Sequence, residues 1–275
     1  MSDQVAPAPA TEFLITKEYR RFAEFCAACQ RDRYIGLCYG PPGVGKTLSA
    51  RYYAQWDELA PGLQAQRTSI ATPIRPALAT CRSIVYTPPV NVTPKRLAEE
   101  VDDQRRALDW VVEAALQPDS DELYGPRPRR IYTELLLIDE ADRLTVLPLE
   151  QVRDIYDRNN LGVVLIGMPG LEKRLARYPQ LYSRVGFVHQ FRPLSTEELR
   201  FILAHKWRQL GLEFSPEDFT DAEAMAAIGL ITGGNFRLVQ RLFSQIARIL
   251  QINQLRTISK EVVEAARENL VIGPL

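Results

Sequence analysis

Short apolar runs alternate with longer amphipathic stretches over the first two thirds of the chain. The apolar runs predict buried strands at 33–39, 83–87, 135–138, 161–167 and 185–191. The amphipathic stretches between them predict helices from Thr16 to about Arg31, from Lys46 to about Leu59, and from Lys95 to about Leu116. Strands that alternate with helices in this way indicate an α/β fold, with a parallel five-stranded sheet covered by helices on both faces.

After residue 193 the pattern becomes helical throughout. Ser195-Thr-Glu-Glu has the form of a capping box, and Ser215-Pro-Glu-Asp resembles another helix start. Residues 235–253 and 259–270 are further amphipathic runs. These signals predict a small all-helical domain behind the α/β core.

Three polar, proline-containing stretches stand outside this pattern, and one of them is a loop at 117–130. Residues 1–12 are rich in Pro and Ala and predict a disordered tail. Residues 61–81 contain three prolines without a clean period and predict a loop insertion. The chain is therefore expected to divide into a tail (1–12), an α/β core (13–193) and a helical domain (194–275).

Composition limits the function classes. The chain has 275 residues, and its 34 basic side chains balance 34 acidic ones, so any nucleic-acid surface must be a local patch. No apolar run is long enough for a transmembrane helix, and the polar start does not resemble a signal peptide. We therefore expect a cytoplasmic protein without a membrane partner.

The four cysteines include one C-x-x-C pair, Cys26 and Cys29. A structural zinc site would need two more ligands at similar spacing, and Cys38 and Cys81 stand alone. Because Phe22, Cys26 and Cys29 recur at helical spacing, buried small residues on an amphipathic helix are the better interpretation than a metal or redox site.

The stretch GPPGVGKT satisfies the pattern G-x-x-x-x-G-K-[ST] and lies between a predicted strand and a predicted helix, the context that this phosphate-binding motif requires. Its glycines let backbone amides surround phosphate oxygens. Lys46 would reach the β- and γ-phosphates of ATP, and Thr47 would bind Mg²⁺. The predicted nucleotide-binding residues are Gly40, Pro41, Pro42, Gly43, Val44, Gly45, Lys46, Thr47 and Leu48.

The stretch LLLIDEADRL supplies the second half of the predicted site. Asp139 ends a buried strand and would hold Mg²⁺ through water, and Glu140 could polarise the attacking water as general base. The letters DEAD invite the interpretation of a helicase. A helicase of that class needs two RecA-like domains and further motifs that this sequence lacks, so Ala141-Asp142 is taken as incidental.

The stretch ITGGNFRLVQRL places Gly-Gly-x-x-Arg at a helix start, the form of a sensor-2 motif, with Arg237 turned toward the γ-phosphate. With the two motifs above, the chain resembles the AAA+ ATPases. That resemblance implies an arginine finger, supplied to a neighbouring subunit from just before the fifth strand. Arg184 stands at that place, with Arg177 as reserve.

The sensor-1 position of this family, usually a polar residue at the end of the fourth strand, is occupied by Met168. Asn159 and Asn160 fall on the wrong side of that strand. This departure from the pattern predicts slow hydrolysis.

The combination of ITKEYRRF, YIGLCYGPPGVGKT, LLLIDEADRL, VVLIGMPGLEKRL and QLYSRVGFVHQFRPLS resembles the transposition-regulator ATPases TnsC, TniB and MuB, in particular their compact members. The resemblance covers roughly residues 13–243. It implies a protein that binds ATP and Mg²⁺, forms rings or helical filaments of identical subunits on double-stranded DNA without sequence preference, recruits a transposase and a TniQ-type target-selection protein, and is reset by ATP hydrolysis.

In that family the DNA-facing elements follow the second strand. Here Thr93, Lys95 and Arg96 open a predicted helix whose free amides could also contact phosphate. A cluster of Arg127, Arg129 and Arg130 is the second candidate. Phe13 or Tyr19, near the amino terminus, is the candidate for the aromatic partner of adenine.

A loader or protein-remodelling ATPase is the alternative to a DNA-assembled regulator. A threading unfoldase would need an aromatic residue in the pore loop after the second strand. The segment 87–94 has no aromatic residue, which counts against this class. An origin-type initiator would usually add a winged-helix or helix-turn-helix domain, for which no room is expected after the helical domain.

Overall fold

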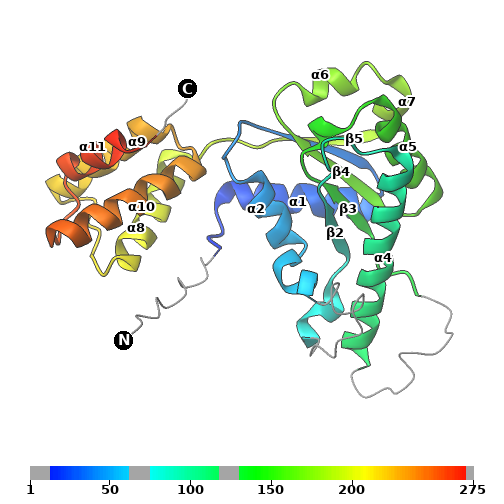
Figure 1. The fold of residues 1–275 in the computed structure, drawn as a ribbon, viewed down its shortest axis with the longest axis horizontal. Coiled ribbons are helices and arrows are strands. Elements are labelled where there is room, and N and C mark those ends of the chain that lie inside the picture. Colours follow the sequence, from blue (N-terminus) through cyan, green and yellow to red (C-terminus); the bar gives the residue numbers. More distant parts are fainter. Residues whose placement is uncertain (1–12, 62–74, 118–129, 271–275) are drawn as a thin grey trace.

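The computed structural model describes residues 13–61, 75–117 and 130–270. Within these residues five parallel strands form one sheet in the order β2-β3-β4-β1-β5 (Figure 1). The strands are β1 (Ile35–Tyr39), β2 (Ser83–Tyr86), β3 (Leu135–Ile138), β4 (Gly162–Gly167) and β5 (Val185–Gln190). The predicted parallel five-stranded sheet is confirmed. Because its strands run in one direction, their carboxyl ends meet at one edge, where ligands bind in open α/β sheets.

Helices cover both faces of the sheet. In the core these are α1 (Lys17–Asp32), α2 (Lys46–Tyr53), α4 (Pro94–Leu116), α5 (Val146–Arg158), α6 (Leu171–Leu175) and α7 (Pro179–Tyr182), with the 3₁₀ helices η1 (Pro76–Thr80) and η3 (Ala141–Arg143). Successive strand residues enter opposite cores: Leu137 packs with α1 and α2, whereas Ile138 packs with α4 and α5. Both faces of β1, β2, β3 and β4 are therefore apolar, whereas residues of the edge strand β5 alternate between half-buried and exposed.

Four further helices follow β5 and lie together at one end of the molecule (Figure 1). They are α8 (Thr196–Gln209), α9 (Phe219–Thr232), α10 (Phe236–Asn253) and α11 (Lys260–Glu268), and we call them the lid. The lid has its own apolar core around Trp207, Leu242 and Ile246. The domain boundary predicted between residues 193 and 194 falls in the segment between β5 and α8.

The helix starts follow the local capping chemistry. Ser195 forms the predicted capping box with Glu198. The start predicted at Ser215 is wrong, because the cap is Asp218, whose carboxylate accepts the backbone N–H groups of Thr220 and Asp221. The first turn of α9 therefore begins three residues later than the Ser-Pro signal indicated.

The continuous helix predicted from Lys46 to Leu59 is also wrong. Helix α2 ends at Tyr53, and Gln55 adopts a left-handed backbone conformation with φ of 50° before helical structure resumes at 56–61. A non-glycine residue with positive φ interrupts the helical hydrogen bonds without leaving a sequence signal. Among the described helices none has the length and apolar character to cross a membrane.

The prediction that Cys26 and Cys29 are buried on one face of a helix is confirmed. All four cysteines are free and buried, and Cys26 and Cys29 pack with Phe22 on the inner face of α1. Burial raises the pKa of the Cys29 thiol to about 12, so this thiol stays protonated near neutral pH. The tail 1–12, most of the insertion 61–81, and Arg127 and Arg129 lie outside the described residues.

Candidate nucleotide site

The phosphate loop leaves the carboxyl end of β1 and turns into α2. Gly45 is the N-cap of α2 with φ of 112°, a conformation that side chains with a Cβ rarely adopt. Val44 is buried in the core, which anchors the loop, whereas Thr47 and Leu48 are exposed at the start of the helix. The loop thus presents the amino end of α2, whose free N–H groups favour an anion.

Lys46 is buried within this loop, with 9% of its surface exposed. Its ammonium group donates hydrogen bonds to the backbone carbonyls of Gly40 and Pro41, at 2.6 and 2.8 Å. Burial lowers the pKa of Lys46, and the charge of Arg237 acts in the same direction. An anion bound in the loop would favour the charged amine and offer it better acceptors than these carbonyls.

Two acids follow β3 at the same edge of the sheet. Asp139 is almost fully buried, and its Oδ1 accepts the backbone N–H of Glu140 at 3.0 Å. Glu140 has φ of 52°, and its exposed carboxylate forms an ion pair with Arg143. The carboxylate of Asp139 and the hydroxyl of Thr47 are oxygen donors that line one cavity, and such donors suit Mg²⁺. These two residues would hold the metal, which supplies positive charge against phosphate.

The start of α10 in the lid contacts the phosphate loop directly. Asn235 is the N-cap of α10, and its side-chain amide also donates a hydrogen bond to the carbonyl of Pro42 at 2.8 Å. The backbone N–H of Arg237 donates to the carbonyl of Gly43 at 2.9 Å. A Cβ on Gly43 would lie 2.5 Å from Oδ1 of Asn235, so this close approach requires glycine.

Together the phosphate loop, the acids after β3, the end of β4 and the start of α10 enclose a cavity of about 660 Å³. Lys46, Asp139, Glu140 and Arg237 all line it. The structure therefore brings the predicted phosphate, metal, base and sensor-2 residues to one place. A cavity of this size accommodates a ligand as large as a nucleotide.

Asp142 was wrongly set aside as incidental. Its Oδ2 accepts the backbone N–H of Met168, the residue directly after β4, at 2.7 Å. A Cβ on Gly167 would lie 2.5 Å from the same oxygen. Asp142 lines the cavity, and its negative charge raises the pKa of Lys46 against the effect of burial. A polar side chain thus reaches the end of β4 from η3, where the sequence offers only Met168, which is 40% exposed.

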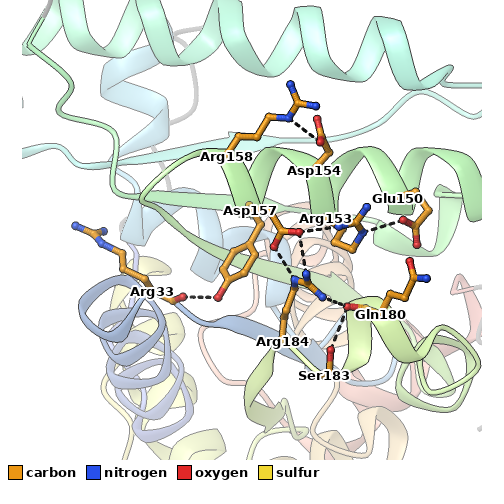
Figure 2. A network of polar contacts seen from close by, with 10 residues as sticks. Arg33, Glu150, Arg153, Asp154, Asp157, Arg158, Gln180, Ser183 and Arg184 are labelled. Carbon is orange, nitrogen blue, oxygen red and sulfur yellow. Dashed lines mark hydrogen bonds and ion pairs between the residues drawn. The ribbon is translucent and has the colours of Figure 1, made fainter.

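Arg184 lies between α7 and β5 and does not line the cavity. Its guanidinium group forms a two-pronged pair with the carboxylate of Asp157 at the end of α5 (Figure 2). The side chain of Arg177 is exposed and forms no ion pair with any described residue. Neither arginine lines the cavity of its own chain.

The candidate DNA contacts lie at the amino end of α4. The hydroxyl of Thr93 caps the helix by accepting the backbone N–H of Arg96. Lys95 is strongly exposed, and its Nζ lies 3.8 Å from Oε1 of Glu99. Nε of Arg96 donates a hydrogen bond to Oε1 of Glu100 at 2.7 Å. Exposed pairs of this kind contribute at most about 1 kcal/mol, so a phosphate could displace them.

The two aromatic residues named for adenine meet a third, Tyr52 of α2. Phe13 stacks on Tyr52 with ring centroids 3.9 Å apart, and Tyr19 contacts both rings edge-on. Burial raises the pKa of Tyr19 to about 12. None of these rings lines the cavity, although Leu48, one helical turn before Tyr52, does.

The sequence and the fold of this chain are similar to those of known proteins. Residues 29–175 match the AAA domain family. A "Potential ATP-binding protein" of Staphylococcus aureus is 47% identical over 266 residues, which are 95% of this chain and 97% of that protein. The Thermotoga maritima RuvB Holliday junction branch migration motor has the same fold, with a TM-score of 0.59 and 20% identity over 95% of this chain and 71% of its own.

The Aeropyrum pernix ORC1 protein, solved in complex with DNA, also has the fold, with a TM-score of 0.55 and 20% identity. The match covers 91% of this chain and 64% of that one. At such identities the two solved structures show a shared fold and nothing more specific.

Proposed function

The chain belongs to the AAA domain family, and from that premise we propose that it is an ATPase that assembles on duplex DNA when ATP is bound. The observation that carries the proposal is that the residues of the predicted site lie in two separate places. Lys46, Asp139 and Glu140 line one cavity, whereas Arg184 lies outside it. The site is complete only when a second copy of the chain brings Arg184 to it.

Each residue has one chemical role in this proposal. Lys46 and the loop amides bind the β- and γ-phosphates, with Thr47 and Asp139 as metal ligands. Glu140 accepts a proton from water, whose oxygen bonds to the γ-phosphorus while the bond to the β-γ bridging oxygen breaks, so that ADP and phosphate leave. Because Arg143 pairs with Glu140, this base must first exchange that partner for water.

Arg237 connects the state of the nucleotide to the lid. It lines the cavity and belongs to α10, whose first residues bind the phosphate loop directly. A γ-phosphate would draw its guanidinium group inward, and the lid would move with it. Hydrolysis removes that attraction, which gives a physical basis for disassembly in the ADP state.

Duplex DNA is proposed as the surface on which the chain assembles. The named RuvB and ORC1 proteins are a branch migration motor and a protein solved with DNA, respectively, and both share this fold. Since the net charge is zero, binding must rest on few phosphate contacts per chain, multiplied along an oligomer. Thr93, Lys95 and Arg96 are the proposed contacts.

Within this class we propose a regulator of transposition of the TnsC, TniB and MuB type. The support is the set of sequence stretches quoted above, which now lie at the phosphate loop, the acids after β3 and the segment around Arg184. Such a protein would recruit a transposase and a TniQ-type target-selection protein. A ring and a helical filament both agree with an arginine supplied in trans.

A loader or remodelling ATPase is the second candidate. The observation in its favour is that Lys95 and Arg96 are each paired with a glutamate one turn further along α4. That pairing lowers the positive potential of the proposed DNA surface.

Titration of duplexes of several sequences, with and without ATP and at three salt concentrations, separates the two candidates. The regulator should bind every sequence in an ATP-dependent manner, with about 0.9 added to the log–log salt slope for each phosphate contacted. Lys46→Ala should abolish the ATP dependence.

Lys95→Ala combined with Arg96→Ala should weaken binding on all sequences and flatten the slope. Arg106→Ala is the matched control, because Arg106 forms similar ion pairs on the same helix with Asp102 and Asp103. If the wild-type protein binds duplex DNA no better with ATP than without it, the loader alternative replaces the DNA-assembled regulator.

A further inference from the structure

Arg184 is held both at its backbone and at its guanidinium group. Its backbone carbonyl accepts a hydrogen bond from Ile35, the first residue of β1, at 3.2 Å. Its guanidinium group binds Asp157 with Nε at 2.6 Å from Oδ1 and Nη2 at 2.9 Å from Oδ2. Two parallel bonds to one carboxylate fix the plane of the group as well as its place.

Asp157 is itself fixed from the other side. Nη1 of Arg153, one turn earlier on α5, donates to Oδ2 of Asp157 at 2.6 Å, and Nε of Arg153 donates to Glu150 at 2.8 Å (Figure 2). The four side chains form a row of alternating charge that ends in Arg184. An anion that approaches this end of the row therefore meets a cation first.

The guanidinium group retains capacity for another acceptor. It has five N–H groups, of which two bind Asp157 and one on Nη1 donates to the carbonyl of Gln180. One N–H on each terminal nitrogen has no partner in the described parts of the chain. A phosphate could bind there in the two-pronged manner that arginine favours without breaking the pair with Asp157.

The Asp157 carboxylate is ionised and partly exposed. Its pair with Arg184 is the main cause that lowers the pKa of Asp157, and Arg153 adds to the effect. The carboxylate therefore stays ionised to a lower pH than an ordinary aspartate. About 30% of each side chain is exposed, so the pair lies at the protein surface, within reach of another chain.

We propose that Asp157 is a positioning residue that holds Arg184 ready to bind the nucleotide of a neighbouring copy of the chain. This inference rests on the proposed function, in which Arg184 acts in trans. Without Asp157, the long side chain of Arg184 would have to be ordered at each encounter. Ordering one such side chain lowers the rate by roughly three- to tenfold.

The test uses mixed oligomers on duplex DNA, with ATP hydrolysis as the readout. The acceptor chain is Arg184→Ala, which keeps its own nucleotide site and lacks the trans arginine. The donor chain is Lys46→Ala, which cannot use ATP but still offers Arg184. Donors that also carry Asp157→Asn are compared with donors that carry Asp154→Asn. Asp154 is the matched control, because it pairs with Arg158 on the same helix and has no contact with Arg184 (Figure 2).

We expect the plain donor and the Asp154→Asn donor to restore hydrolysis equally, and the Asp157→Asn donor to restore roughly three- to tenfold less, with an unchanged KM for ATP. Equal or greater restoration by Asp157→Asn would overturn the inference, since Asp157 would then be neutral or would restrain Arg184. If the plain donor restores nothing, the trans role of Arg184 and this inference fall together.

Melting temperatures of the donors guard against a folding defect. If Asp157→Asn unfolds well below Asp154→Asn, Asp157→Glu takes its place, because glutamate keeps the charge and displaces the pair by one methylene. Reduced restoration at an unchanged melting temperature supports positioning. Full restoration by Asp157→Glu would contradict it.

Discussion

Replacing Asn235 by serine isolates the hydrogen bond between the lid and the phosphate loop. Serine is as good an N-cap as asparagine, so α10 should keep its first turn. The serine side chain is too short to replace the amide that donates to the carbonyl of Pro42 at 2.8 Å. A neutral hydrogen bond contributes about 0.5–1.5 kcal/mol, so the equilibrium constant for docking of the lid should fall roughly two- to tenfold.

The assay is equilibrium binding of a fluorescent ATP analogue, together with denaturant unfolding. Asp218→Ser is the control, because it exchanges the cap of α9 in the same way and the side chain of Asp218 accepts hydrogen bonds from Thr220 and Asp221 at the start of its own helix. We expect Asn235→Ser to bind the analogue roughly two- to tenfold more weakly than Asp218→Ser, at similar stability. Equal affinity of the two variants would refute the view that Asn235 connects the lid to the phosphate loop.

Further outcomes follow from the site and the core. Glu140→Gln should still bind ATP but release phosphate about 100-fold more slowly, and a wild-type rate would exclude Glu140 as the base. Asp142→Ala should lower the free energy of unfolding by about 0.5–1.5 kcal/mol, because the partly exposed backbone N–H of Met168 exchanges its carboxylate acceptor for water; unchanged stability in denaturant would contradict that. Since burial raises the pKa of Cys81 to about 11 and that of Cys29 to about 12, thiol reagents at pH 8 should label them slowly until the protein is denatured; rapid labelling of the native protein would contradict their burial.

The parts of the site that depend on local chemistry could be predicted from the sequence. The phosphate loop needs only glycines and a lysine at fixed spacing between a strand and a helix, and Asp139 follows directly from the end of an apolar run. The sheet could be predicted because buried parallel strands are apolar on both faces. These features are encoded within a few consecutive residues.

The contacts that complete the site join distant parts of the chain and leave no local pattern. Asn235 meets Pro42 across 193 residues, and Asp142 reaches Met168 because η3 lies beside the end of β4. The presence of a third acid in DEAD was the available signal for Asp142. The pair of Asp157 and Arg184 depends in the same way on the packing of α5 against α7.

Sedimentation of the protein with a labelled duplex, with a non-hydrolysable ATP analogue or with ADP, tests the central claim most directly. We predict that the ATP analogue alone gives large complexes that contain many copies of the chain per duplex, and that Arg184→Ala, which still binds the analogue, fails to form them. Assembly that is equal with ADP and with the ATP analogue, or that is unaffected by loss of Arg184, would contradict an ATP-switched oligomer completed in trans.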